Sequence, residues 1–402
     1  MILQNRHEPR ETSRADSQGQ PDMLAIKGEE LMHRDVAIIG GGLSGLSLAY
    51  QLEREGVDYV LLEARDRLGG RILSESSNKN LTSDERYDLG PAWIWPGQPR
   101  IASLIREFGL TVFEQYSKGK LVYQEADGSV RRDFNFSTMA GSLRIAGGVA
   151  SLIDALWTRI DEKRILLSHA VTHVSQNKDG FTIAANGPKE ELSINARCVV
   201  HAVPPSIVAR TISFDPPLSR DVLNTLEATP TWMAGQAKLV AIYEEPFWRE
   251  MGLSGDGISR SGPLMEIHDA SPHGAKAGAL FGFVNVPSGS QARERSTLIN
   301  NAIPQLEAMF GAQASDPVDV LFKDWANDRL TASNDDEASL QHALYGRPNV
   351  LAQLANEGLM FSSAEIGTQF GGLLEGALEA AEGSMLLISQ SERSMGRHTL
   401  AR

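Results

Sequence analysis

One stretch near the start of the chain, Asp35–Arg71, combines a glycine pattern with the elements that normally surround it. Val36–Ile39 is a short apolar run with β-branched residues, which predicts a buried parallel strand. In the following Gly40-x-Gly42-x-x-Gly45, the first glycine permits a tight turn, the second lets a pyrophosphate approach the backbone, and the third lets helix and strand pack closely. The helix that opens there offers free N–H groups and its positive dipole end to phosphate.

A second strand and an acidic residue complete the unit. Tyr59–Leu62 is a short apolar run, and Glu63 closes it, about 20 residues after the glycines. A carboxylate at this place can accept hydrogen bonds from both ribose hydroxyls of an adenosine. A plain glycine-rich turn between a strand and a helix would not require these additions, so the segment predicts dinucleotide binding.

The residues that follow indicate which dinucleotide binds. The run Glu63-Ala64-Arg65-Asp66-Arg67-Leu68-Gly69-Gly70-Arg71 resembles the segment after the first βαβ unit in flavin-containing amine oxidases. In that family the paired glycines and the arginines surround the pyrophosphate and ribityl chain of FAD. An extended FAD needs hydrogen-bond donors and cations beyond the first turn. An ordinary charged loop would not require them at these positions. The resemblance implies FAD contacts from Glu63, Ala64, Arg65, Gly69, Gly70 and Arg71.

A second match to the same family is the run Ala237–Trp248, AKLVAIYEEPFW. Amine oxidases carry a strand of this form whose lysine holds a water molecule against flavin N5, so the resemblance implies a catalytic Lys238. A cation at that place would stabilise negative charge on the cofactor. An unpaired ammonium in an apolar strand is costly, which favours a functional role over an edge-strand lysine that faces solvent.

A third match lies near the end of the chain, in Phe361–Glu365 and Gly371–Ala377. It resembles the closing FAD motif of the family and implies that Glu365 lies near the ribityl or pyrophosphate region. The helix start at Leu374 would then point at the flavin edge where charge accumulates. The family also contacts the adenine end through a backbone position that corresponds to Val171. The resemblance extends over residues 35–387.

Departures from the family concern the substrate side. Two aromatic residues usually align the amine, but one of these positions is Leu373 here, and no aromatic residue occurs in the segment 330–337 after Trp325. We expect this aromatic cage to be absent or rebuilt from Trp93 or Trp95. No cysteine occurs there either, so the resemblance implies noncovalent FAD. The helical lobe over the substrate is much reduced, because about 50 residues separate Trp93 from the next landmark. The site is therefore either more open or closed by a second subunit of a homodimer.

Composition excludes several other classes of function. The net charge of −13 argues against a nucleic-acid partner, and no apolar run is long enough to span a membrane. The single cysteine, Cys198, lies in an apolar run, so nothing indicates an oxidising compartment, and we expect a cytoplasmic protein. His169 and His173 have the spacing of helical metal ligands, but their context is a strand without a third ligand, so we predict no metal site.

The fold class that follows is α/β: a Rossmann-like FAD-binding domain interleaved with an α+β substrate domain built on an antiparallel sheet. We expect a disordered segment over residues 1–32 without the apolar core of a signal peptide, and a flexible tail over 391–402. The FAD-binding domain should combine 33–100, 145–231 and 326–390, and the substrate domain 101–144 and 232–325. Within the former, Ile165–His173 is expected to be one strand.

The function that the resemblance implies is oxidation of an amine by FAD. A hydride would pass from the α-carbon of the amine to flavin N5, water would hydrolyse the imine, and O2 would reoxidise the flavin to give hydrogen peroxide. Two alternatives stay open: a C–C desaturase similar to protoporphyrinogen oxidases, and a degenerate FAD-binding scaffold. Lys238 favours the amine reaction, while the missing cage motivates the scaffold.

Overall fold

A computed structural model describes residues 32–79, 85–333 and 342–394 of the chain. Residues 1–31, which form most of the segment predicted to be disordered, and residues 395–402 of the predicted tail lie outside the described residues. Met32 already belongs to strand β1, and the last helix, α9 (Leu374–Ser394), extends into the segment predicted as a tail.

Within the described residues, the first sheet has eight strands in the order β13-β10-β11-β12-β1-β2-β9, with β19 also paired to β12. Strands β1, β2, β9, β12 and β19 run parallel where they pair, as expected for a dinucleotide-binding unit. The strands are β1 (Met32–Ile39), β2 (Tyr59–Leu62), β9 (Ile165–Leu166), β10 (Ala170–Asn177), β11 (Gly180–Asn186), β12 (Glu191–His201), β13 (Ser213–Asp215) and β19 (Leu359–Phe361).

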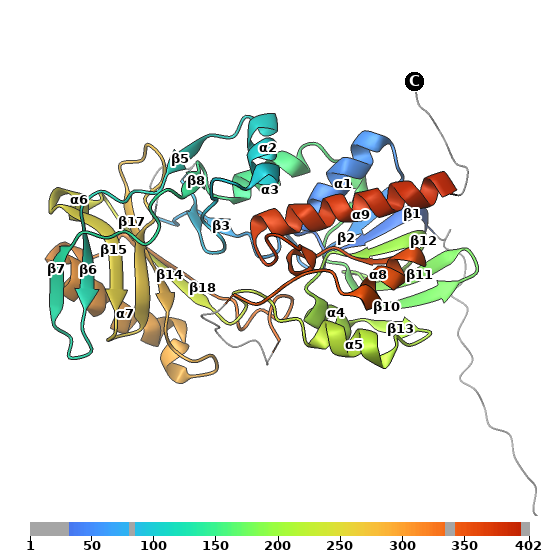
Figure 1. Cartoon of the computed structure of the whole chain (residues 1–402). Coiled ribbons are helices and arrows are strands. Elements are labelled where there is room, and N and C mark those ends of the chain that lie inside the picture. Colours follow the sequence, from blue (N-terminus) through green and yellow to red (C-terminus); the bar gives the residue numbers. More distant parts are fainter. Residues whose placement is uncertain (1–31, 80–84, 334–341, 395–402) are drawn as a thin grey trace, which may run out of the picture. The chain divides into compact units, whose positions relative to one another are not determined.

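Both faces of this sheet are covered by helices, because alternate residues of each strand point to opposite sides. Val36 and Ile38 of β1 belong to one core with side chains of α1 (Leu43–Glu55), α3 (Ala150–Trp157) and α9. Ala37 and Ile39 belong to a second core with α4 (Pro205–Thr211), α5 (Arg220–Glu227) and α8 (Asn349–Asn356). Figure 1 shows α1 and α9 side by side on one face and α4 and α5 on the other.

The second sheet has seven strands in the part of the chain that the structure describes, in the order β18-β14-β17-β16-β15-β6-β7. All neighbouring pairs are antiparallel except β15 with β6. Its strands are β6 (Lys120–Gln124), β7 (Val130–Phe134), β14 (Ala237–Tyr243), β15 (Leu253–Ser259), β16 (Leu264–Asp269), β17 (Gly278–Val284) and β18 (Asp319–Asp324).

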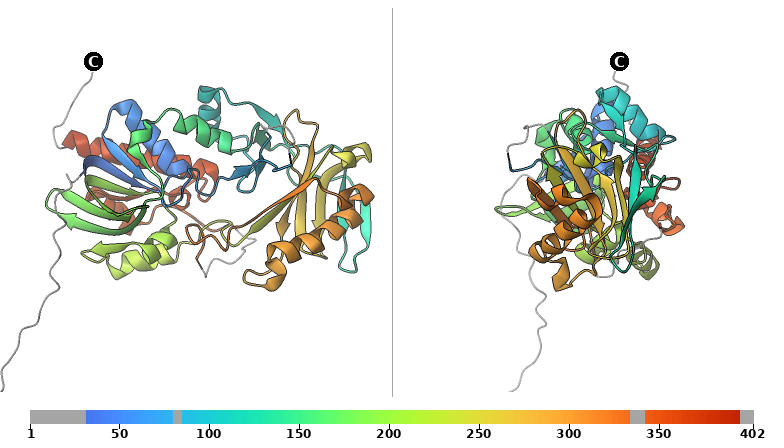
Figure 2. Two further views of the ribbon diagram at one scale, coloured as in Figure 1. Left: turned by 180° about the vertical axis from the view of Figure 1, so that it is seen from behind. Right: turned by 90° about the vertical axis from the view of Figure 1, so that its left-hand side faces the viewer.

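The two faces of this sheet have different environments. Ala237, Leu239 and Ala241 of β14 pack in a core with α7 (Arg295–Phe310) and with α6 (Phe247–Glu250). Figure 2 shows α7 along this face. Val240 and Ile242 point the other way and pack with residues of the chain segment around β4 (Tyr87–Asp88). Lys238 has the same parity as Val240, so its side chain lies on this second face.

The segment that replaces the usual helical lobe is short and extended. Helix α2 (Pro99–Phe108) packs through Ile101 and Ile105 into the core that contains α1 and α9. From residue 109 to 149, all of which are described, the chain forms no helix, only β5 (Val112–Glu114), β6, β7 and β8 (Leu143–Ile145). A two-stranded ribbon of β3 (Ser74–Glu75) with β4 precedes it. The segment 109–149 therefore carries no helical lobe, in line with the reduction expected from the sequence.

One predicted strand is divided. The segment Ile165–His173 forms two strands, β9 and β10, because the chain turns at Ser168, where φ is +58°. The turn is held by hydrogen bonds from Ser168 N to Arg65 O and from His169 N to Glu63 O. Apolar periodicity did not reveal this break, which places β9 beside β2 and β10 beside β11.

Candidate functional site

A cavity of about 650 Å³ lies at the carboxyl ends of β1 and β2 and continues to Lys238 of the second sheet. Its size is in the range of cofactor and ligand pockets. Nearly all of the residues predicted for the site line this cavity: Gly40, Gly42, Glu63, Ala64, Arg65, Gly69, Gly70, Arg71, Trp93, Trp95, Val171, Lys238, Trp325, Leu373 and Leu374. The two predicted residues that do not line it, Gly45 and Glu365, lie directly behind its wall.

The glycine turn has the geometry that its sequence predicts. Gly40 has a φ of +109°, which favours glycine. A Cβ atom on Gly45 would lie 2.0 Å from Gly40 O, so only glycine allows α1 to pack on the turn. At Gly42 the nearest atom to such a Cβ would be Gly70 Cα at 4.0 Å, so the backbone there is open to the cavity.

Glu63 lies in the cavity wall, and each of its two oxygens accepts a backbone hydrogen bond. Gly41 N donates to Oε2 at 2.7 Å, and Arg65 N donates to Oε1 at 2.8 Å. A carboxylate has about four lone-pair sites, so further acceptor capacity is left for a ligand. The glycine turn and the end of β2 are therefore joined through the carboxylate predicted to bind ribose.

Two arginines of the same segment are held by acidic side chains from distant parts of the chain. Arg71 forms a two-point contact with Glu365, with distances of 2.7 and 3.1 Å. Arg65 donates to Asp328 Oδ1 at 2.6 Å and to the hydroxyl of Thr331 at 2.9 Å. Asp328 and Thr331 are functional candidates that the sequence did not indicate, because they follow β18 and have no motif of their own.

Helix α9 begins at the cavity with Leu374, two residues after Gly372, where φ is +78°. Glu375 was missed by the sequence analysis. Its side chain is fully buried and accepts hydrogen bonds from the backbone N–H groups of Arg100 and Ile101, each at 3.0 Å. This carboxylate joins the start of α9 to the first turn of α2 and therefore fixes the helix end that faces the cavity.

Lys238 is 4% exposed, and its ammonium points at backbone carbonyls. Nζ donates to Gly90 O at 2.7 Å and to Asp88 O at 3.2 Å, and it lies 4.2 Å from the ring centroid of Phe281. Burial lowers the pKa of Lys238 to about 7, although the nearby Asp88 raises it. The group can therefore gain or lose a proton near neutral pH. The sequence analysis expected a fixed cation here.

Aromatic side chains surround Lys238. Trp93 donates from its indole to Gln115 Oε1 at 2.9 Å and packs against Phe281, with 5.3 Å between ring centroids. Trp325 donates to Leu89 O at 2.9 Å and is 6% exposed, whereas Trp95 is 39% exposed. Further residues line the same end of the cavity and were not predicted: Met139, Trp232, Gln236, Phe283 and Leu330.

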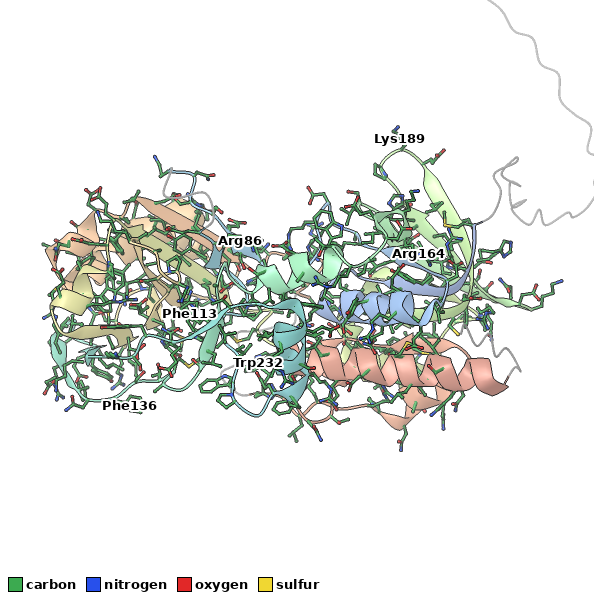
Figure 3. All side chains as sticks on the ribbon, turned by 90° about the horizontal axis from the view of Figure 1, so that it is seen from above. Arg86, Phe113, Phe136, Arg164, Lys189 and Trp232 are labelled. Carbon is green, nitrogen blue, oxygen red and sulfur yellow. The ribbon has the colours of Figure 1, made fainter. Side chains whose placement is uncertain are left out.

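Trp232, one of these unpredicted lining residues, packs against the turn before α9. A Cβ atom on Gly372 would lie 2.9 Å from Trp232 Cβ, so the tryptophan lies against the turn that precedes Leu373. Its ring packs on His342 with 4.5 Å between centroids. Figure 3 shows Trp232 beside the beginning of α9. Trp232 therefore lies close to Leu373, the position at which an aromatic residue is usual in the family that the sequence resembles.

The cavity has features that an elongated dinucleotide fits. Ser363 Oγ is buried in its wall without a hydrogen-bond partner among the described residues, so a bound group can supply one. The open backbone at Gly42 and the guanidinium of Arg71 suit a pyrophosphate. His169 also lines the cavity, but the described residues contain no group of three or more His, Cys, Asp or Glu side chains that could hold a metal ion.

The described part of the chain contains no helix that is long and apolar enough to cross a membrane. Cys198 is buried. It lies on β12, away from the residues that line the cavity.

Comparison with known proteins gives a consistent picture. The sequence model of the family described as "Flavin containing amine oxidoreductase" matches residues 43–134 and 112–383. The chain is 26% identical to the putrescine oxidase of Kocuria rosea over 483 aligned positions, which cover 90% of this chain and 97% of that protein. It is 23% identical to the flavin-containing amine oxidase A of Sus scrofa, with coverage of 87% and 83%. The first alignment is longer than this chain of 402 residues, so that relative carries insertions.

Solved structures show the same fold. Wild-type putrescine oxidase bound to putrescine superposes with a TM-score of 0.72 at 22% identity, covering 90% of this chain and 100% of that chain. Cyclohexylamine oxidase from Brevibacterium oxydans IH-35A gives a TM-score of 0.71 at 18% identity, covering 90% and 99%. The interleaved arrangement of a parallel-rich sheet and a mostly antiparallel sheet is therefore shared with these proteins.

Proposed function

The chain belongs to the family of flavin-containing amine oxidoreductases, and from this premise we propose that it binds FAD noncovalently and oxidises an amine. The overall reaction for a primary amine is RCH2NH2 + O2 + H2O → RCHO + NH3 + H2O2. When bound, FAD supplies the group that accepts a hydride from the α-carbon of the amine. The protein supplies binding, orientation and electrostatics.

The observation that carries the proposal is the position of Lys238 at the far end of the dinucleotide cavity. Its Nζ lies in an apolar wall of the same cavity whose other end contains the Gly40–Gly45 turn and Glu63. A proton held at Nζ places positive charge where electron-rich species form during oxidation and during reaction with O2. Because the pKa of Lys238 is about 7, this proton can also be released and regained during turnover.

The remaining predicted residues have consistent roles in holding FAD. Glu63 would accept from the ribose, the turn at Gly42 with Gly69 and Gly70 would enclose the pyrophosphate, and Val171 would contact the adenine end. Arg71, oriented by Glu365, would face the pyrophosphate or ribityl chain. The domain division that we propose from the sequence is supported by the distribution of the two sheets along the chain. Helix α2 lies largely in the range 101–144 proposed for the substrate domain but packs with α1 and α9 of the first sheet.

The position of the single cysteine supports the proposed noncovalent attachment. Cys198 is the sole cysteine of the chain, and it does not line the cavity, so no thiol is available to attach the cofactor. Purified protein should be yellow, and acid or heat should release intact FAD into the supernatant. Flavin that stays with the precipitate would contradict this part of the proposal.

A panel of amines tests the reaction. The protein is mixed with primary alkyl, aralkyl and diamine substrates, and peroxide release is measured together with anaerobic bleaching of the visible flavin band. Amine-dependent bleaching followed by peroxide release on adding O2 supports an oxidase. Bleaching without peroxide would indicate another electron acceptor, and no bleaching with any amine would favour the scaffold or desaturase alternatives. The protein's relatives are named as amine oxidases, which favours the C–N reaction.

A further inference from the structure

Gln236 is a buried polar residue at the substrate end of the cavity whose side chain has no assigned partner. Its backbone is fixed on both sides: its N–H donates to Met233 O at 3.1 Å, and its carbonyl accepts from Trp325 N at 3.0 Å. The residue is 6% exposed and lines the cavity together with Lys238, two positions further along. The intervening Ala237 packs into the opposite core, so Gln236 and Lys238 have the same parity.

The side-chain Oε1 of Gln236 is buried and has no hydrogen-bond partner among the residues that the structure describes. The cavity lining also contains Phe283 and Leu373, whose side chains have no donor, and Trp93, whose indole N–H donates to Gln115 instead. The ammonium of Lys238 already donates to two carbonyls. Buried amide oxygens in native proteins almost always receive a hydrogen bond, so an unpaired one in a cavity wall indicates that a ligand provides the donor.

We propose that the side-chain oxygen of Gln236 accepts a hydrogen bond from the nitrogen of the substrate amine and orients its α-carbon. This inference rests on the proposed function. Leu373 stands at a position where an aromatic residue would be expected to align the amine. The hydrogen bond to Gln236 would orient the amine in its place. The oxygen of a carboxamide restrains the amine by accepting a hydrogen bond from the N–H group of the amine. An aromatic cage restrains the amine by shape.

The chemistry of hydride loss agrees with an acceptor at this place. A neutral amine expels a hydride from its α-carbon with the help of the nitrogen lone pair, so the protein must hold the nitrogen without using that pair. An acceptor does this, because it takes the N–H and leaves the lone pair free. The other side chains at this end of the cavity, Trp93, Met139, Phe283 and Leu373, favour an apolar body. The substrate class is therefore a primary or secondary amine with an apolar substituent.

Two ligands that cannot be turned over test the contact. α,α-Dimethylbenzylamine has no hydrogen on its α-carbon, so it binds without reacting, and its N,N-dimethyl derivative lacks the N–H as a free base. The dissociation constant of each is measured on the flavin-loaded protein from the change in the visible flavin spectrum, at a pH where the amine is neutral. In Gln236→Met, which keeps side-chain length and removes the acceptor, binding of the first ligand should weaken about tenfold, the effect of one hydrogen bond. Binding of the second should stay within about twofold.

Matched variants separate the competing explanations. Gln236→Leu should repeat the result of Gln236→Met, and flavin content per chain should stay unchanged in both. Ser384→Ala removes another buried oxygen that has no hydrogen-bond partner among the described residues, on α9 and outside the cavity lining, and should leave the binding of both ligands unchanged. Equal weakening of both ligands in Gln236→Met, no weakening of either, or loss of flavin would each overturn the inference. If wild type neither binds nor oxidises any amine, the proposed function itself fails, which is a different result.

Discussion

Lys238 Nζ of the antiparallel sheet donates a hydrogen bond of 2.7 Å to the carbonyl of Gly90, which lies 148 residues earlier in the chain. Gly90 follows β4, whose Asp88 carbonyl also accepts from Lys238. The contact joins the second sheet to the loop that carries Trp93, and it holds a titratable group inside the cavity. The predictions below concern this group and three other buried charged or polar side chains.

Replacing Lys238 with Met should keep FAD bound and slow the reaction with O2. The substitution keeps side-chain length and removes the charge, while the dinucleotide contacts lie elsewhere. Reoxidation should slow by roughly 10²–10³, the usual effect of removing one electrostatic group, and reduction by the amine should change less. Stopped-flow measurement of both half-reactions on wild type and variant decides this. Equal reoxidation rates would show that Lys238 has no role in the oxidase step.

The pH dependence of the same step gives an independent check. Burial lowers the pKa of Lys238 to about 7, so its ammonium is lost as pH rises through that region. The rate of reaction with O2 should therefore fall on the alkaline side in wild type, and Lys238→Met should show no such fall. A matching alkaline decline in the variant would assign the titration to another group.

Replacing Glu63 with Ala should weaken FAD binding by about 1–3 kcal/mol, the scale of a lost hydrogen bond to a charged group. The change removes a predicted ribose acceptor and also leaves the N–H groups of Gly41 and Arg65 without their carboxylate partner. Titration of the apoprotein with FAD, followed by quenching of flavin fluorescence, measures the effect. Glu55→Ala, at the exposed last residue of α1, is the control and should bind FAD like wild type.

Asp328 joins two cations and should matter for stability. It accepts from Arg65 at 2.6 Å and from Lys323 at 2.9 Å, and its side chain is 11% exposed. Asp328→Asn should lower the free energy of unfolding by about 2 kcal/mol, because two charge-assisted hydrogen bonds are weakened at a largely buried site. Asp133→Asn breaks an exposed pair with Arg131 and should cost less than about 0.5 kcal/mol. Urea denaturation measures the free energy of unfolding of both variants. Similar losses in the two would show that the Asp328 contacts contribute no more than the exposed pair.

His201 should make stability depend on pH. It is fully buried and packs against Phe214 and Phe361, and neither ring nitrogen has a hydrogen-bond partner within the described part of the chain. Burial lowers its pKa from 6.5 to about 3, so between these values the unfolded chain binds more protons than the folded protein. Stability from this residue is fully present above pH 6.5 and falls by up to about 1.4 kcal/mol per pH unit as pH decreases toward 3.

Replacing His201 with Phe should remove this dependence. The variant should be more stable than wild type by about 1 kcal/mol at pH 7, because a buried polar ring without partners is replaced by an apolar one. The difference should grow on lowering the pH to 5, since only the wild-type side chain then titrates in the unfolded chain. Chemical denaturation at both pH values measures it, and an unchanged difference would place the titration elsewhere.

Patterns that are local in the chain made much of this architecture predictable. The apolar run Val36–Ile39, the glycine turn at Gly40–Gly45 and the strand at Tyr59–Leu62 are each local patterns, so the first βαβ unit follows from the sequence. Lys238 could be selected because its strand resembles one of the family and the lysine interrupts an apolar run. Ser168 shows the limit of this approach, because a turn inside an apolar segment leaves no mark in its periodicity.

Only the tertiary structure decided which side chains share the cavity. Thr331, Trp232 and Gln236 carry no motif, and they reach the cavity because β14 and β18 pair in one register. The partners of Arg71 and Arg65 lie 294 and 263 residues away in the chain, so no local pattern could identify them. The burial that lowers the pKa of Lys238 likewise comes from Phe281, Trp93 and the loop at Gly90, which only the folded chain brings together. Short-range patterns determine the elements, whereas the charge and partners of a buried group depend on long-range packing.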